Sequence, residues 1–274
     1  MALRATVVLI QAPKFTPDPR VVFTHYFALG DSMSIDLYPA LDAGEFEVAV
    51  ALERVPTAGS VAPLGASSLL YCNSEERWPD DVGNDLSSMY PDLAFVNLAT
   101  DGATIGDVFG EQNTQLTDSD EPVLLTLTVG GNDLLSAFGT RPRPVLLDKI
   151  VSDIIEAYDF LVDTLRGRFP NGQLLVTTVY DPSDGTGKIP GVYDDRGPLP
   201  IHTVDRLNDH IRALAIGTPR VLLADAFAHF RGHGVSAAED DRWYWRRSLI
   251  EPNARGASEL RHLWLDALGA GGES

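Results

Sequence analysis

The feature that most constrains the fold is the alternation of short apolar runs with longer segments of helical periodicity. Runs rich in aliphatic and β-branched residues predict strands at 21–29, 93–98, 122–129, 173–180 and 221–225. Helical periodicity predicts helices at 64–71, 78–90, 104–116, 146–169, 201–216 and 253–268. Alternating strands and helices favour a parallel sheet with helices on both faces, which is an α/β fold.

The segments between these elements do not divide the chain into domains. Residues 1–20 predict an N-terminal arm, and 36–65 is poor in helical periodicity, with a short hairpin strand expected at 45–53. Two long irregular stretches, 181–199 and 226–250, are expected to be active-site loops, because long loops are usually functional. We therefore expect a single domain over all 274 residues.

Composition limits the partners of the chain. A net charge of −18 argues against nucleic-acid phosphates and anionic membrane surfaces. There is no apolar run of membrane-spanning length and no clear signal-peptide cleavage site, so a cytoplasmic location is expected. The one cysteine, Cys72, cannot form an internal disulfide and is expected to be buried. Because no histidine pair has the spacing of a zinc site, we expect no metal or cofactor.

Residues suited to chemistry follow the first predicted strand. The run 21–29 ends at Gly30, and the polar residues Asp31 and Ser32 follow at once. In an open α/β sheet, ligands bind just beyond the carboxyl ends of the strands. Ser32 therefore lies where a nucleophile is expected, and free backbone N–H groups at such a turn can hold an anion.

Three stretches, in order, resemble the motif blocks of the GDSL, or SGNH, hydrolases, a family of esterases and lipases. They are Gly30-Asp31-Ser32, Asn97–Thr104 and Val129–Asp133, and each follows an apolar run. The resemblance extends from Tyr26 to the last predicted helix. It implies a three-layer α/β/α sandwich with a flavodoxin-like parallel sheet.

The resemblance also implies roles for individual residues. Ser32 is the expected nucleophile, and the oxyanion donors are its own backbone N–H, the Gly102 N–H and the Asn132 side chain. Asp31 is expected to be structural. Asp133 has a position suited to capping the helix that follows.

The stretch of this chain that corresponds to the fourth block of the family departs from the usual form of that block, which is Asp-x-x-His followed by Pro. Pro252, Asn253 and the following helix match, but Ser248 replaces the Asp and Glu251 replaces the His. In the family this His is the general base and the Asp orients it. The ordinary Ser-His-Asp triad is therefore missing from this block.

Three alternatives follow from that departure. In the first, Glu251 is the base, with its pKa raised by an apolar pocket that the aromatic residues 243–245 supply. In the second, which we place slightly ahead because imidazole titrates near neutral pH, His233 is the base and Glu251 orients it. In the third, the fold binds a ligand without cleaving it.

Together these features predict a serine hydrolase that cleaves a carboxylic ester, an acyl or acetyl ester, through a Ser32 acyl-enzyme. Its substrate is expected to be a small-molecule ester, and no cofactor is required. The alternative is a non-catalytic, ligand-binding relative that lacks a competent base. The sequence predicts no oligomeric state.

Overall fold

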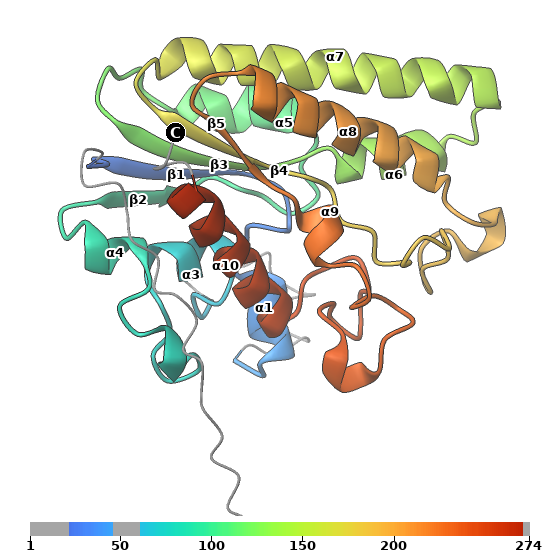
Figure 1. Ribbon diagram of the computed structural model, residues 1–274. Coiled ribbons are helices and arrows are strands. Elements are labelled where there is room, and N and C mark those ends of the chain that lie inside the picture. The colour runs from blue at the N-terminus through green and yellow to red at the C-terminus, as the bar shows by residue number, and fades with distance from the viewer. Residues whose placement is uncertain (1–21, 46–60, 271–274) are drawn as a thin grey trace, which may run out of the picture.

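The computed structural model describes residues 22–45 and 61–270, and within them the chain forms a five-stranded parallel sheet (Figure 1). The order of the strands is β2-β1-β3-β4-β5. Their bounds are His25–Gly30 for β1, Ala94–Asn97 for β2, Val123–Thr128 for β3, Gln173–Thr177 for β4 and Val221–Ala224 for β5. All five predicted strands are confirmed, and this order is the flavodoxin-like one.

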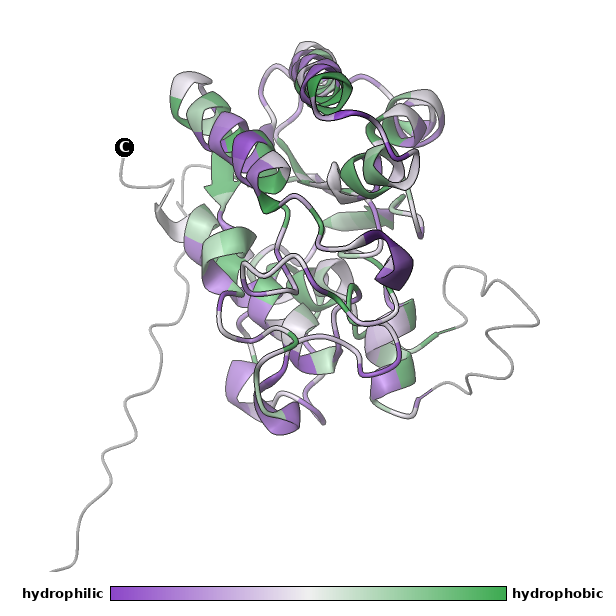
Figure 2. Ribbon diagram, turned by 90° about the vertical axis from the view of Figure 1, so that its right-hand side faces the viewer, coloured by the Kyte–Doolittle hydropathy of each residue, from purple (hydrophilic) through white to green (hydrophobic). Residues whose placement is uncertain are grey.

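Helices cover both faces of the sheet, which confirms the three-layer arrangement (Figure 1). One layer contains α5 (Ile105–Asp107), α6 (Gly131–Gly139), α7 (Pro144–Arg168) and α8 (Ile201–Gly217). The other contains α1 (Leu37–Asp42), α3 (Ala66–Tyr71), α4 (Leu86–Met89) and α10 (Ala254–Ala270), and α9 (Ala226–His229) follows β5. Purple and green segments alternate along the longer helices, as expected where only one side of a helix is apolar (Figure 2).

Alternate residues of β1 serve the two layers. Ala28 packs in the cluster that includes α3 and α10, whereas its neighbour Leu29 packs in the cluster that includes α7 and α8. The predicted apolar stripe of the 146–169 helix lies on the inner side of α7, where Tyr158 and Leu161 are fully buried. The alternation of residues along the strand and the apolar stripe of the helix therefore both direct side chains into the core beside the sheet.

Three details of the helices differ from the predictions, although the 104–116 segment is helical over nearly its whole length. The 78–90 segment contains only a 3-10 turn, η1 (Pro79–Asp81), and the short α4, because Gly83 adopts a positive φ between them. The 104–116 segment begins as α5 and then widens into a π-helical turn, η2 (Val108–Gln112). Helix α1 forms in a stretch for which no helix was predicted.

Two other predictions have different outcomes. Cys72 is exposed rather than buried, because it follows the last turn of α3. The predicted arm at 1–20 and nearly all of the hairpin strand at 45–53 lie outside the described residues. Among the helices of 22–45 and 61–270, none has both the length and the apolar character needed to cross a membrane.

The sheet order creates a crevice at the carboxyl ends of β1 and β3. These two strands pair in parallel up to Gly30 opposite Thr128, while the chain leaves them toward opposite edges of the sheet. Such a reversal of strand order is where open α/β sheets bind ligands. The segment after β1 contains Ser32, and the segment after β3 contains Asn132.

Candidate active site

Gly30 brings the end of β1 into close contact with β3. Its φ is +129°, and a Cβ at this position would lie 1.9 Å from the carbonyl oxygen of Thr128. The side chain of Gln112 brackets the same glycine: Oε1 accepts from the Gly30 N–H at 2.7 Å and Nε2 donates to its carbonyl at 2.8 Å. The π-helical turn of η2 thus has a role, because it presents the buried Gln112 amide to the backbone beside Ser32.

A tight turn after Gly30 presents Ser32. The Asp31 N–H donates to the carbonyl of Thr128 at 2.8 Å, and the Asp31 carboxylate accepts from the Met33 N–H at 3.1 Å. This is the structural role expected for Asp31. Ser32 is 8% exposed and lines a cavity, and its N–H donates to no acceptor within the described part of the chain.

The expected oxyanion residues come from the segments after β2 and β3. Asn132 lies in the first turn of α6, lines the same cavity as Ser32, and donates from Nδ2 to the Ala103 carbonyl at 3.0 Å. This bond ties Asn132 to the turn that contains Gly102, whose φ is +72°. The turn is also tied to β1, because the Thr100 N–H donates to the Gly30 carbonyl at 3.0 Å.

The capping prediction for Asp133 is wrong. Gly130 is the residue at the N-cap of α6, with φ +114°. The Asp133 carboxylate instead accepts from the Ile105 N–H at 3.1 Å, at the start of α5. It therefore fixes the neighbouring segment relative to α6, which a reading of local sequence cannot detect.

Glu251 reaches Ser32 from the loop before α10. Its N–H donates to the Ser248 carbonyl at 3.0 Å, its carbonyl accepts from the Trp245 N–H at 2.8 Å, and the next residue, Pro252, bridges to Tyr244. Glu251 is 6% exposed and lines the same cavity as Ser32. Its Oε2 atom has no hydrogen-bond partner among the described residues.

The surroundings of Glu251 make it an unusual carboxyl group. Its pKa is raised to about 8: burial is the largest cause, the charges of Asp101 and Asp31 act in the same direction, and the Ser32 hydroxyl acts against them. Burial also raises the pKa of Asp31 to about 7. The Tyr38 hydroxyl donates to Asp101 at 3.0 Å and so holds that carboxylate in place. A carboxylate with a raised pKa binds a proton more strongly, as a general base must.

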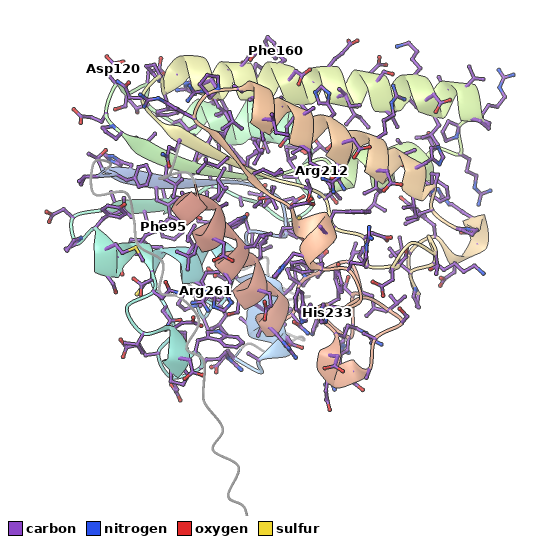
Figure 3. All side chains as sticks on the ribbon, viewed as in Figure 1. Phe95, Asp120, Phe160, Arg212, His233 and Arg261 are labelled. Atoms are coloured by element: carbon purple, nitrogen blue, oxygen red, sulfur yellow. The ribbon has the colours of Figure 1, made fainter. Side chains whose placement is uncertain are left out.

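The expected grouping of His233 with Ser32 and Glu251 is not assembled. The His233 ring stacks on Trp243 with centroids 3.7 Å apart, and Nδ1 lies 2.9 Å from the Asp241 carbonyl. Figure 3 shows His233 in the loops after α9. The aromatic residues 243–245 pack in the protein rather than line the cavity at Ser32.

The other histidines are also engaged elsewhere. All six lie in the described part of the chain, and none lines the cavity at Ser32. Their neighbours are Thr24 for His25, Asp159 for His210, Glu259 for His229 and Asp81 for His262, while His202 lines a second cavity. Among residues 22–45 and 61–270, no group of three or more His, Cys, Asp or Glu side chains is arranged to hold a metal ion.

The wall of the cavity beyond Ser32 is apolar. Helices α6 and α8 and the expected loop at 181–199 supply it, and its members include Leu134, Leu135, Phe138, Ile189, Leu199 and Val204. From the 226–250 loop only Ile250 lines the cavity, next to Glu251. The site therefore combines a hydroxyl, a buried carboxyl and an apolar chamber, which suits attack on an ester of an apolar acid.

Comparison of the sequence with protein families decides the assignment. Residues 57–258 match the GDSL-like Lipase/Acylhydrolase family. The chain belongs to this family. The match begins after the Gly30-Asp31-Ser32 turn, and it includes the segments of Gly102, Asn132 and Glu251. Family membership supports an acyl-ester hydrolase of the esterase type.

Solved structures show the same fold for this GDSL-like protein. An extracellular lipase from Streptomyces rimosus is 19% identical, with a TM-score of 0.54 over 89% of this chain and 99% of that one. Phospholipase A1 from Streptomyces albidoflavus is 20% identical, with a TM-score of 0.56 over 90% and 100%. An acetylxylan esterase from Geobacillus stearothermophilus is 15% identical, with a TM-score of 0.57 over 91% and 95%. A comparison with curated proteins gave no match.

The buried Asp31 of this GDSL-like protein predicts a pH-dependent stability. The pKa of Asp31 is about 7 in the folded state, and its ordinary value is 3.8. Because the folded state therefore binds this proton more tightly, the contribution of Asp31 to the free energy of unfolding is fully present below about pH 4 and is lost as the pH rises through 7. We expect Asp31→Asn and the wild type to be similarly stable at pH 4. At pH 8 the variant should be more stable by a few kcal/mol, on the order of 1.4 per pH unit of pKa change. Urea unfolding at both pH values measures this, and an equal difference at pH 4 and pH 8 would contradict it.

Proposed function

We propose that this protein is a serine esterase in which Ser32 is the nucleophile and Glu251 is the general base. The observation that carries the proposal is that Ser32 and the buried Glu251 carboxyl line one cavity, where the Ser32 hydroxyl lowers the pKa of that carboxyl. None of the six histidines lines this cavity. A serine hydroxyl needs a base beside it, and Glu251 is the group that we propose for this role.

The reaction proceeds in two half-reactions. Ionised Glu251 takes the proton of Ser32 Oγ while Oγ attacks the carbonyl carbon of the ester, which forms a tetrahedral oxyanion. As this collapses, the C–O bond to the alcohol breaks and Glu251 gives its proton to the leaving oxygen. A water molecule then attacks the acyl-enzyme, Glu251 again accepts a proton, and Ser32 leaves with that proton as the free acid is released. No cofactor takes part in these steps.

The tetrahedral oxyanion needs hydrogen-bond donors that are already in position. The proposed donors are the Ser32 N–H, the Gly102 N–H and the Asn132 amide. The bond from Asn132 to the Ala103 carbonyl supports this role, because it couples the amide to the Gly102 turn. Donors fixed by such bonds stabilise developing charge without having to reorganise.

Asn132→Ala tests the oxyanion role. Removing one such donor costs about 10²- to 10³-fold in kcat in comparable sites, and we expect a loss in that range with little change in KM. Steady-state kinetics on p-nitrophenyl butyrate measure both constants. An increase in KM with an unchanged kcat would contradict the oxyanion role of Asn132.

The substrate class follows from the chamber and from the relatives. A carboxylic ester with an apolar acyl group fits the apolar wall beyond Ser32. The lipase, the phospholipase A1 and the acetylxylan esterase of similar fold support cleavage of an acyl or acetyl ester. We therefore propose small-molecule acyl esters as substrates.

One observation favours a second function, ligand binding without cleavage. A carboxyl group with a pKa of about 8 is mostly protonated at neutral pH and then cannot act as a base. Labelling with a fluorophosphonate at pH 8.5 separates the two functions, since the probe reacts only with an activated serine. The esterase predicts a Ser32 adduct in the mass spectrum of the wild type and none in Ser32→Ala. An unlabelled wild type would favour the binding protein.

A further inference from the structure

The apolar chamber at Ser32 has a defined far end. Phe138, Leu147 and Pro200 line both this chamber and a second cavity. The first cavity has a volume of about 90 Å³ and the second about 560 Å³. Charged groups, including Arg141 and Asp195, line the second cavity. Three side chains are thus shared by the apolar cavity at Ser32 and a second cavity with charged groups in its lining.

Other groups hold Phe138, one of these three residues, in place. Its ring contacts the ring of Tyr193, with centroids 5.7 Å apart. The Arg196 guanidinium lies 4.2 Å from the centroid of the Tyr193 ring and also donates to the Gly139 carbonyl at the end of α6. The loop at 181–199 therefore fixes Phe138 from behind, so the end of the chamber is a built wall.

The position of Phe138 sets a length. Asn132, beside the reaction centre, and Phe138 both lie on α6, and six residues of helix advance about 9 Å. An extended carbon chain with bonds of about 1.5 Å advances about 1.25 Å per bond, so roughly seven bonds fill that distance.

We infer that Phe138 closes an acyl-chain pocket and restricts this protein to acyl esters of medium length, with an optimum at hexanoyl or octanoyl. The inference rests on the proposed ester hydrolysis and extends it to a substrate class. Each methylene within the pocket leaves water and should raise kcat/KM about fourfold, equivalent to 0.8 kcal/mol. Chains longer than the pocket meet the Phe138 ring and gain nothing more.

The test is kcat/KM for p-nitrophenyl esters from acetate to dodecanoate, with three variants. Phe138→Ala joins the two cavities, and we expect its optimum to move to decanoate or dodecanoate, with the dodecanoate-to-octanoate ratio rising at least tenfold. Phe138→Trp shortens the chamber and should move the optimum to butyrate. Phe160→Ala is the matched control, because Phe160 is an exposed phenylalanine on α7 that lines neither cavity. It should leave the optimum where it is in the wild type.

A second readout does not depend on catalysis. Calorimetric binding of free fatty acids from butanoate to dodecanoate should show the same optimum and the same shifts. If hydrolysis does not depend on Ser32 but fatty-acid binding still has this optimum, the proposed ester hydrolysis is wrong and the inferred acyl-chain pocket is supported. A wild-type rate that rises steadily to dodecanoate, or equal profiles in the wild type and both Phe138 variants, would overturn the inference.

Discussion

Replacing Ser32 with alanine should lower kcat/KM for short p-nitrophenyl esters by about 10⁴-fold or more, because the acyl-enzyme can no longer form. The expected size follows from the arrangement in which the turn after Gly30 places this hydroxyl in the cavity that Glu251 also lines. The unfolding temperature should change little, since only one oxygen atom is removed. Initial rates with purified protein measure the effect.

Ser34→Ala is the matched control for this variant. Ser34 lies two residues further along and is fully buried, and its hydroxyl lies 2.8 Å from Thr128 Oγ1 on β3. Its loss should reduce stability by about 1 kcal/mol and leave most of the activity. Equal activity of the wild type and Ser32→Ala on every ester would refute the nucleophile. Equal loss in both variants would indicate damage to the turn instead.

Glu251→Gln should lower kcat/KM about 10³-fold or more, because the amide keeps the shape of the side chain but cannot accept a proton. The wild-type rate should depend on pH, since the base acts only when ionised. With a pKa of about 8, the rate should rise about tenfold per pH unit below 8 and level off above it. The variant should lack this rise.

His233→Ala separates Glu251 from the alternative base. The ring stacks on Trp243, outside the cavity at Ser32, so its removal should cost stability and change kcat/KM only a few-fold. A loss as large as that of Glu251→Gln would restore the Ser32–His233–Glu251 triad. A large loss in Glu251→Gln alone leaves the carboxylate as the base.

The sheet and the place of the site could be predicted because both depend on local patterns. Apolar runs such as 122–129 form strands wherever both faces are covered, and a polar turn directly after a strand must lie at the carboxyl edge. Ser32 and Asn132 line the same cavity for this reason. No family knowledge is needed for that step, only the rule that parallel strands end on the same side.

The surroundings of the site could not be predicted, because they depend on contacts between distant segments. Gln112 lies in a segment with ordinary helical periodicity, and nothing local indicates that its amide brackets Gly30. Nothing in the local sequence around His233 indicates that its ring stacks on the buried Trp243 and so lies away from the cavity at Ser32. The raised pKa of Glu251 likewise arises from burial and from Asp31 and Asp101.

The central claim is that Glu251 activates Ser32, and the pH dependence of Ser32 labelling tests it most directly. The second-order rate of fluorophosphonate labelling, followed by mass spectrometry from pH 5 to pH 10, needs no knowledge of the substrate. The account predicts a rate that rises with pH to a plateau with a midpoint near 8 in the wild type, and a low, flat rate in Glu251→Gln. A midpoint near 6.5 that persists in Glu251→Gln would show that an imidazole, and not this carboxylate, is the base.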